Sequence, residues 1–138
     1  MADRDDVRVV LKNFSIHGDL SDAPAKAVIA AKLQGNDKAE PLDQKLMEKE
    51  YFTQEDMKDR SKLGEKIQKN VMALAKEVGL DVAQLERDMK GEVVAREMNN
   101  VRELAQRFEI SGTPYLIIGE TAFPGAIPYD QIIQALDK

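Results

Sequence analysis

The chain has 138 residues, enough for one domain, and its 43% hydrophobic and 33% charged residues are typical of a folded protein. Its net charge of −5 comes without a basic stripe, which argues against nucleic-acid binding. No apolar run approaches the length of a membrane span, and we expect no signal peptide, because residues 1–6 are acidic.

The sequence contains no cysteine and one histidine, His17. Disulfides and thiolate chemistry are therefore excluded from this chain, and we expect no catalytic residue, no metal site and no cofactor. His17 could act as an acid–base group, but a lone loop histidine is more often structural or solvated. Five acidic residues lack the spacing of a calcium loop and are expected to be solvated or to cap helices: Asp19, Asp22, Glu55, Asp56 and Asp59.

Residues 7–12 predict a β-strand. They are rich in β-branched residues and bounded by turn formers, and the period of two places Val7, Val9 and Leu11 on one face. The high apolar content predicts partial burial of the second face as well. A loop is expected to follow, from Phe14 to Gly18.

A block of four or five helices is predicted over about residues 22–108. Ser21 or Asp22 is expected to cap the first helix, which ends at Gly35, and a second helix is expected to begin near Pro41. The many alanines of the first helix would allow it to pack closely against a neighbour.

The third predicted helix has the clearest pattern, from about Ser61 to Val78. Its apolar stripe consists of Leu63, Ile67, Val71, Leu74 and Val78. Gly79 is placed to end this helix, and Asp81 is placed to cap the next one with Gln84 completing a capping box. A further helix is predicted over residues 92–108.

The end of the chain predicts a β-hairpin and a helix. Residues 113–118 predict a strand with Pro114 at its entrance, where a strand tolerates proline. Gly119 and Glu120 fit a two-residue hairpin turn, and the returning strand is expected over residues 121–123. A final helix is predicted over residues 128–136.

Three segments together resemble the DsbA family of thiol-disulfide oxidoreductases: residues 7–18, 77–81 and 110–130. The third is the most specific. In this segment Gly-Thr-Pro leads into an apolar strand, a hairpin follows, and Pro-Gly-Ala then comes directly before an amphipathic helix. The resemblance implies an α/β (α+β) fold, namely a thioredoxin-like fold with an inserted helical subdomain. It implies a single domain over residues 1–138, with the helical insertion at about residues 22–108.

The resemblance also implies a substrate-binding loop formed by Gly112, Thr113 and Pro114. In the family, the proline matching Pro114 follows a cis peptide bond. The residue matching Thr113 offers its backbone to an extended substrate peptide beside the redox cysteines, a form of β-strand addition. From the Thr-Pro dipeptide alone, Pro114 is an ordinary proline at a strand entrance.

The sequence departs from the family at its start. The family has a strand and a Cys-x-x-Cys helix upstream of the segment matching residues 7–18, and this sequence has neither. We therefore expect a domain truncated at its N-terminus, either a fragment of a longer parent or a shortened gene product. The missing strand would lie between residues 7–11 and 115–118, which leaves two unpaired edges. We expect either a strand-exchanged homodimer or direct pairing of residues 7–11 with the C-terminal hairpin.

The resemblance implies a parent protein that exchanges disulfides in unfolded or extended protein substrates, in the periplasm or another exported compartment of a bacterium. This chain is expected to be inactive in that reaction, because it lacks the redox cysteines. A second hypothesis is a non-catalytic peptide-binding or oligomerisation module on the same fold. A glutathione-linked isomerase or transferase is a weaker third, since the serine or cysteine that would open the first helix is missing.

Overall fold

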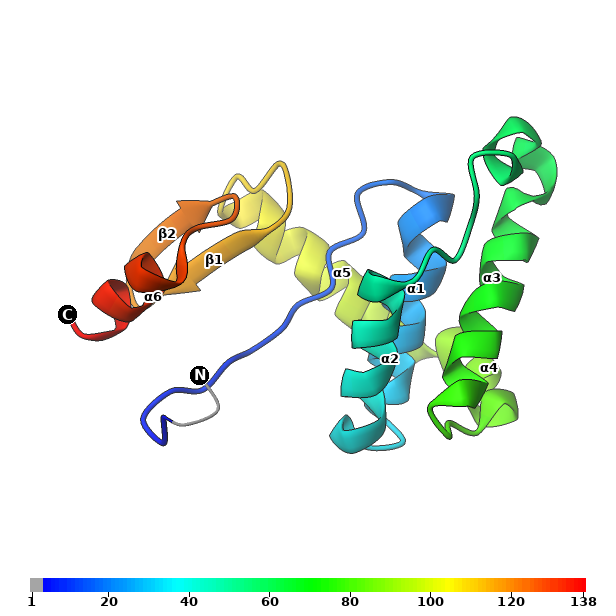
Figure 1. The fold of residues 1–138 in the computed structure, drawn as a ribbon, viewed down its shortest axis with the longest axis horizontal. Helices are drawn as coiled ribbons and strands as arrows, with labels where there is room; N and C mark the ends of the chain where they lie inside the picture. The colour runs from blue at the N-terminus through cyan, green and yellow to red at the C-terminus, as the bar shows by residue number, and fades with distance from the viewer. Residues whose placement is uncertain (1–3) are drawn as a thin grey trace. The chain divides into compact units, whose positions relative to one another are not determined.

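The computed structural model describes residues 4–138, which form six α-helices, one 3-10 helix and a two-stranded sheet (Figure 1). They divide into two compact units, one ending at Val101 and the other formed by Arg102–Lys138. Of the helices in the described residues, none has the length and apolarity that crossing a membrane requires. The single domain over residues 1–138, with an insertion at residues 22–108, stays a prediction.

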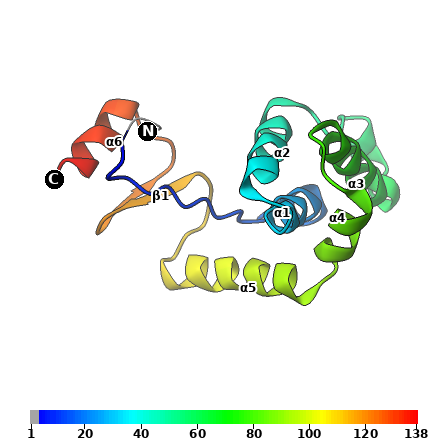
Figure 2. The same cartoon turned by 90° about the horizontal axis from the view of Figure 1, so that it is seen from below.

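The first unit is helical. Its elements are α1 (Asp19–Ala31), α2 (Asn36–Glu48), the 3-10 helix η1 (Asp56–Lys58), α3 (Arg60–Glu77), α4 (Val82–Met89) and the start of α5 (Glu92–Arg107). Figure 2 shows α1 lying among α2, α3 and α4, and α1 contacts all three. The side chains of Ala27, Ala30 and Ala31 are fully buried, so small residues on α1 allow this close approach.

The core of this unit follows the predicted stripe of α3. Leu63, Ile67, Val71 and Leu74 are buried, as predicted, whereas Val78 is partly buried against the same cluster. Leu42 of α2 and Leu85 of α4 are among the largest fully buried side chains. Burial of one apolar side of each helix therefore provides the main stabilisation of the unit.

The starts of α1 and α2 differ from the prediction. Ser21 and Asp22 lie inside α1 and do not cap it. The hydroxyl oxygens of Ser15 and Ser21 lie 2.8 Å apart, the Ser15 hydroxyl donates to the Asp22 carboxylate, and the His17 N–H donates to Ser21 Oγ at 2.9 Å. These bonds order the preceding loop. Pro41, where the second helix was expected to begin, lies inside α2.

The junction of α3 and α4 agrees with the sequence signals. Gly79 follows α3 with a φ of 83°, in the left-handed region that favours glycine. The Asp81 carboxylate accepts a hydrogen bond from the Gln84 N–H at 2.9 Å, as an N-cap residue does. The end of α3 at Gly79 and the cap at Asp81 are confirmed. The capping box is wrong, because the Asp81 N–H donates to Gln34 Oε1 at 2.9 Å and the Gln84 side chain donates to Asp88.

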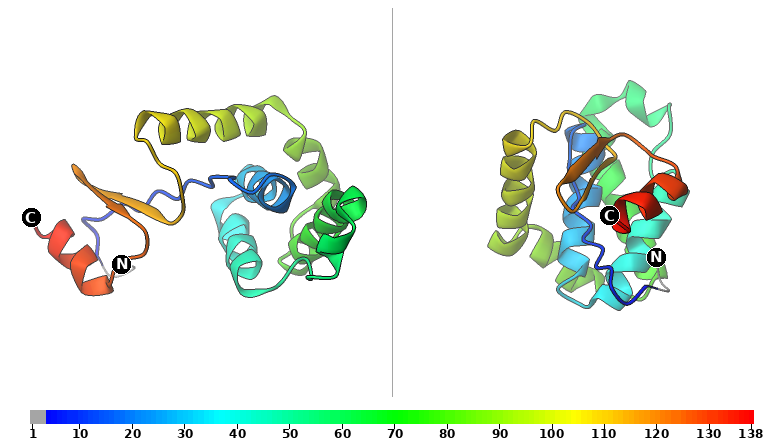
Figure 3. Two further views of the ribbon diagram at one scale, coloured as in Figure 1. Left: turned by 90° about the horizontal axis from the view of Figure 1, so that it is seen from above. Right: turned by 90° about the vertical axis from the view of Figure 1, so that its left-hand side faces the viewer.

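The second unit contains the end of α5 and three further elements: β1 (Tyr115–Ile118), β2 (Thr121–Pro124) and α6 (Tyr129–Leu136). β1 and β2 pair antiparallel with Ile118 opposite Thr121, so Gly119 and Glu120 form the predicted two-residue turn. Gly119 has a φ of 59° and Glu120 has no positive φ, as a type II′ turn requires. α6 contacts β1 (Figure 3, left).

The predicted strand over residues 7–12 is wrong. These residues form no regular element, and the sheet of the described chain consists of β1 and β2 alone, so direct pairing of residues 7–11 with the hairpin is also wrong. Val9, Val10 and Leu11 are 61%, 60% and 57% exposed. A strand forms only where a neighbour satisfies its backbone groups, and these residues have no such neighbour in the described chain.

Candidate functional site

The three predicted site residues lie together in the loop that enters β1. Gly112 is half-buried, and Thr113 and Pro114 are exposed. The peptide bond between Thr113 and Pro114 is cis. The loop therefore presents both residues to solvent immediately before the first strand of the hairpin.

One hydrogen bond within the second unit holds one side of this loop. The Pro114 carbonyl accepts a hydrogen bond from the Gly125 N–H at 2.9 Å, which joins the loop to the bend after β2. Thr113 makes no backbone hydrogen bond to any residue that the structure describes. Its N–H and C=O are therefore available to a partner.

The strand after the loop continues this free edge. Because Ile118 and Thr121 close a two-residue turn, they form a hydrogen-bonded pair. From there, non-hydrogen-bonded and hydrogen-bonded pairs alternate along the hairpin. Tyr115 and Ile117 belong to non-hydrogen-bonded pairs, so their N–H and C=O groups point away from β2. We call the free backbone groups of Thr113, Tyr115 and Ile117 the β1 edge.

The site offers backbone hydrogen bonding and has no thiol. The chain has no cysteine, and the described residues contain no group of three His, Cys, Asp or Glu residues that could hold a metal ion. His17 is exposed and lies in the first unit, in the loop before α1. The β1 edge can therefore bind an extended backbone by hydrogen bonds, as an unpaired strand does.

Three of the acidic residues that we considered as cation ligands have structural partners. Asp22 accepts from Ser15, as described above. The Asp59 carboxylate accepts from the Ser61 N–H at 3.2 Å and caps α3. The Asp56 carboxylate accepts from the Thr53 N–H at 2.8 Å and forms an ion pair with Lys66. Only Asp59 has the expected capping role, because Asp22 lies inside α1 and Asp56 lies inside the 3-10 helix η1.

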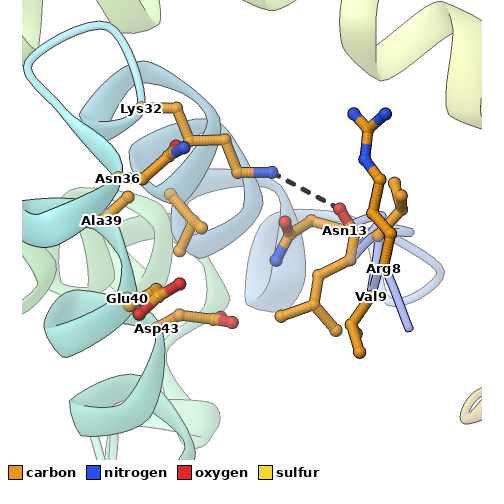
Figure 4. A pocket seen from close by; sticks show the side chains of 11 residues that line it. Arg8, Val9, Asn13, Lys32, Asn36, Ala39, Glu40 and Asp43 are labelled. Carbon is orange, nitrogen blue, oxygen red and sulfur yellow. Dashed lines mark hydrogen bonds between the residues drawn. The ribbon is translucent and has the colours of Figure 1, made fainter. Parts of the chain in front are cut away.

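The sequence did not point to a pocket of about 330 Å³ in the first unit, between residues 8–13 and helices α1 and α2 (Figure 4). Lys32 donates to the Leu11 carbonyl at 3.4 Å and links the two walls. Burial raises the pKa of Asp43, against the opposing effects of Asn13 and Lys32. Asn13 Oδ1 is buried without a hydrogen-bond partner. No local sequence signal marks this pocket, because distant segments form it.

Comparison with known proteins defines the class of the protein. A solved structure of a thioredoxin-like oxidoreductase from Silicibacter pomeroyi DSS-3 is 31% identical to this chain, with a TM-score of 0.74, and the match covers 91% of this chain. The protein therefore has a thioredoxin-like fold. A model of the DSBA-like thioredoxin domain matches residues 28–137, and the chain belongs to this family.

The extent of these matches bears on the site. The chain spans 64% of the length of that solved structure. No curated protein matches the chain. The region that matches the family includes Gly112, Thr113 and Pro114, so the candidate loop lies within the family domain.

Proposed function

We propose that this chain binds extended peptides at the β1 edge and does not itself exchange disulfides. The observation that carries the proposal is the free backbone of Thr113 beside the exposed Pro114, in a family member without cysteine. In the parent activity that the family resemblance implies, an exported bacterial protein exchanges disulfides in unfolded substrates. This chain would keep the contact to substrate and lack the reacting sulfur atoms.

The expected inactivity follows from the chemistry of the exchange. A thiolate attacks a disulfide sulfur, a mixed disulfide forms, and a second thiol releases it, so each step needs a cysteine sulfur. The six methionines of this chain are thioethers and cannot form such a bond. We expect no acceleration of insulin reduction by dithiothreitol above the buffer rate. Acceleration by this chain, purified free of other oxidoreductases, would contradict the claim.

The peptide contact would be a strand addition. A peptide strand beside β1 would exchange backbone hydrogen bonds with Thr113, Tyr115 and Ile117, with little dependence on its side chains. Binding of an unfolded peptide should therefore shift the NMR amide signals of these three residues. The amides of α3, in the first unit, serve as the internal control.

Two controls separate backbone pairing from nonspecific adhesion. A peptide with alternate amides N-methylated cannot donate on one edge and should bind weakly or not at all. Pro114→Ala should weaken binding, because proline shapes the loop, whereas Pro128→Ala at the start of α6 should not. Equal binding of the methylated and unmethylated peptides would exclude the proposed contact.

A specific observation favours the alternative, an oligomerisation module. All of residues 110–138 are described, and none of them is buried. The segment nevertheless contains Leu116, Ile118, Phe123, Ile132 and Ile133. A segment of this length without disulfides does not form a sufficient core by itself. Association with another chain would cover these side chains.

A further inference from the structure

Residues 7–11, which we call the N-terminal arm, have the composition of a strand and no strand partner. Val9, Val10 and Leu11 are each more than half exposed. Residues 7–10 make no backbone hydrogen bond to any residue that the structure describes, and the Leu11 carbonyl accepts only from Lys32. The arm is therefore a β-branched segment with free backbone groups at residues 7–10, and its residues 8–11 also form one wall of the pocket described above.

The hairpin provides one edge suited to receive a strand. The outer edge of β2 includes Pro124, which has no N–H to donate. The β1 edge has donors at Thr113, Tyr115 and Ile117, and the Ile117 side chain is 45% exposed. A strand added to the hairpin would therefore join β1 and not β2.

The charges of the two segments are complementary. From Phe108 to Asp137 the sequence has no lysine or arginine and four acidic residues, namely Glu109, Glu120, Asp130 and Asp137. The arm carries Arg8 and no acidic residue. Beside the arm, Asp6 is paired with Arg4 at 2.6 Å and Lys12 is paired with Glu97 at 2.8 Å, and Asp5 lies one residue further out. Like charges therefore disfavour pairing of two arms or two hairpins, and opposite charges favour pairing of an arm with a hairpin.

We propose that the arm of one copy pairs with the β1 edge of a second copy, so that two chains form a homodimer. The proposal deepens the oligomerisation alternative and does not depend on peptide binding. In a two-fold dimer each chain gives its arm and receives that of its partner, which makes two equivalent contacts. These contacts provide backbone partners for the arm and cover part of the exposed apolar surface of β1.

The test measures the mass of the full chain by sedimentation velocity from low micromolar to submillimolar concentration. The natural chain should change from monomer to dimer as concentration rises. The variant Val9→Pro/Val10→Pro removes an N–H on each side of the arm, so its dimer should dissociate at least about tenfold more readily. The matched control Val9→Thr/Val10→Thr keeps both N–H groups and the β-branched shape, and it should dimerise like the natural chain.

Circular dichroism of the proline variant should be unchanged in its helical signal, because the arm lies outside every helix. A natural chain that stays monomeric would overturn the proposal. A proline variant that dimerises as tightly as the natural chain would also overturn it, as would protection of the arm amides in a monomer. Repeating the peptide titration on the proline variant tests peptide binding separately from dimerisation. A failure of peptide binding would therefore not count against the proposed dimer.

Discussion

Gln34 and Asp81 join the segment after α1 to the start of α4 through two reciprocal hydrogen bonds. The Gln34 side-chain amide donates to the Asp81 carbonyl, and the Asp81 N–H donates to Gln34 Oε1, both at 2.9 Å. The Asp81 carboxylate meanwhile caps α4. One glutamine thus fixes the position of a helix start that is distant in sequence.

We expect Gln34→Ala to lower the free energy of unfolding by about 0.5–1.5 kcal/mol, because it removes the protein partner of the Asp81 N–H, whereas the Asp81 carbonyl keeps its hydrogen bond from the Leu85 N–H. Urea denaturation measures the change. Gln106 is exposed on α5 and makes no side-chain hydrogen bond that the structure records, so Gln106→Ala should stay within about 0.5 kcal/mol of the natural chain. An equal effect of the two substitutions would show that the Gln34 bonds do not stabilise the fold.

Ala30→Leu should destabilise the first unit by about 1–3 kcal/mol, because it inserts a larger side chain where α1 contacts three helices. Ala30 is fully buried. The control is Ala95→Leu, at an exposed position of α5 where leucine is equally compatible with a helix. Thermal unfolding of both variants checks the prediction, and a stabilised Ala30→Leu variant would mean that α1 is loosely packed.

The Asp56 carboxylate should make the free energy of unfolding decrease as the pH falls into the acid range. The hydrogen bond from Lys66 and those from Thr53 hold the pKa of its carboxyl below the usual value. Its side chain is only 5% exposed. Because the folded-state pKa is below the unfolded one, the stabilisation is present above about pH 4 and is lost as the pH falls through the folded-state pKa.

Asp56→Asn should therefore be less stable than the natural chain at neutral pH and approach it in strong acid. Urea midpoints measured from neutral pH into acid give the comparison. Lys66→Met removes the main cause of the lowered pKa, so it should move the loss of stability to higher pH. Parallel pH curves for all three proteins would contradict the assignment.

The contribution of Asp43 to the free energy of unfolding should change with pH in the opposite direction. Burial beside the pocket raises the pKa of its carboxyl, so its contribution is present below about pH 4 and is lost as the pH rises through the folded-state value. Asp43→Asn should be at least as stable as the natural chain at neutral pH. Asp37→Asn, at an exposed position in the first turn of the same helix, should be slightly destabilising, because a negative charge there favours the helix N-terminus. A loss of stability in Asp43→Asn would contradict the prediction.

Most helices and the hairpin could be predicted from sequence, because their signals are local. The stripe of α3, the glycine after it, the cap at Asp81 and the turn at Gly119 each depend on residues within a few positions of one another. The start of α1 was mispredicted although its residues are also close in sequence, because Ser21 and Asp22 bond to Ser15 rather than to the helix N-terminus.

The strand predicted over residues 7–12 shows the limit of local reasoning. Its composition suits a strand, but a strand also needs a neighbour, and the neighbour depends on distant residues. The described part of the chain lacks this strand, and the family assignment rests on the match over residues 28–137 and on the similar solved structure.

The amino-acid sequence alone determined which chemistry is excluded, since a chain without cysteine has no thiol to exchange, and it determined the periodic helices. Only the tertiary structure decided that the Thr113 backbone is free, that residues 7–11 are exposed, and that Asn13, Lys32 and Asp43 line one pocket. The reason is physical: helix and turn signals act over a few residues, whereas exposure and strand pairing depend on which distant segments meet.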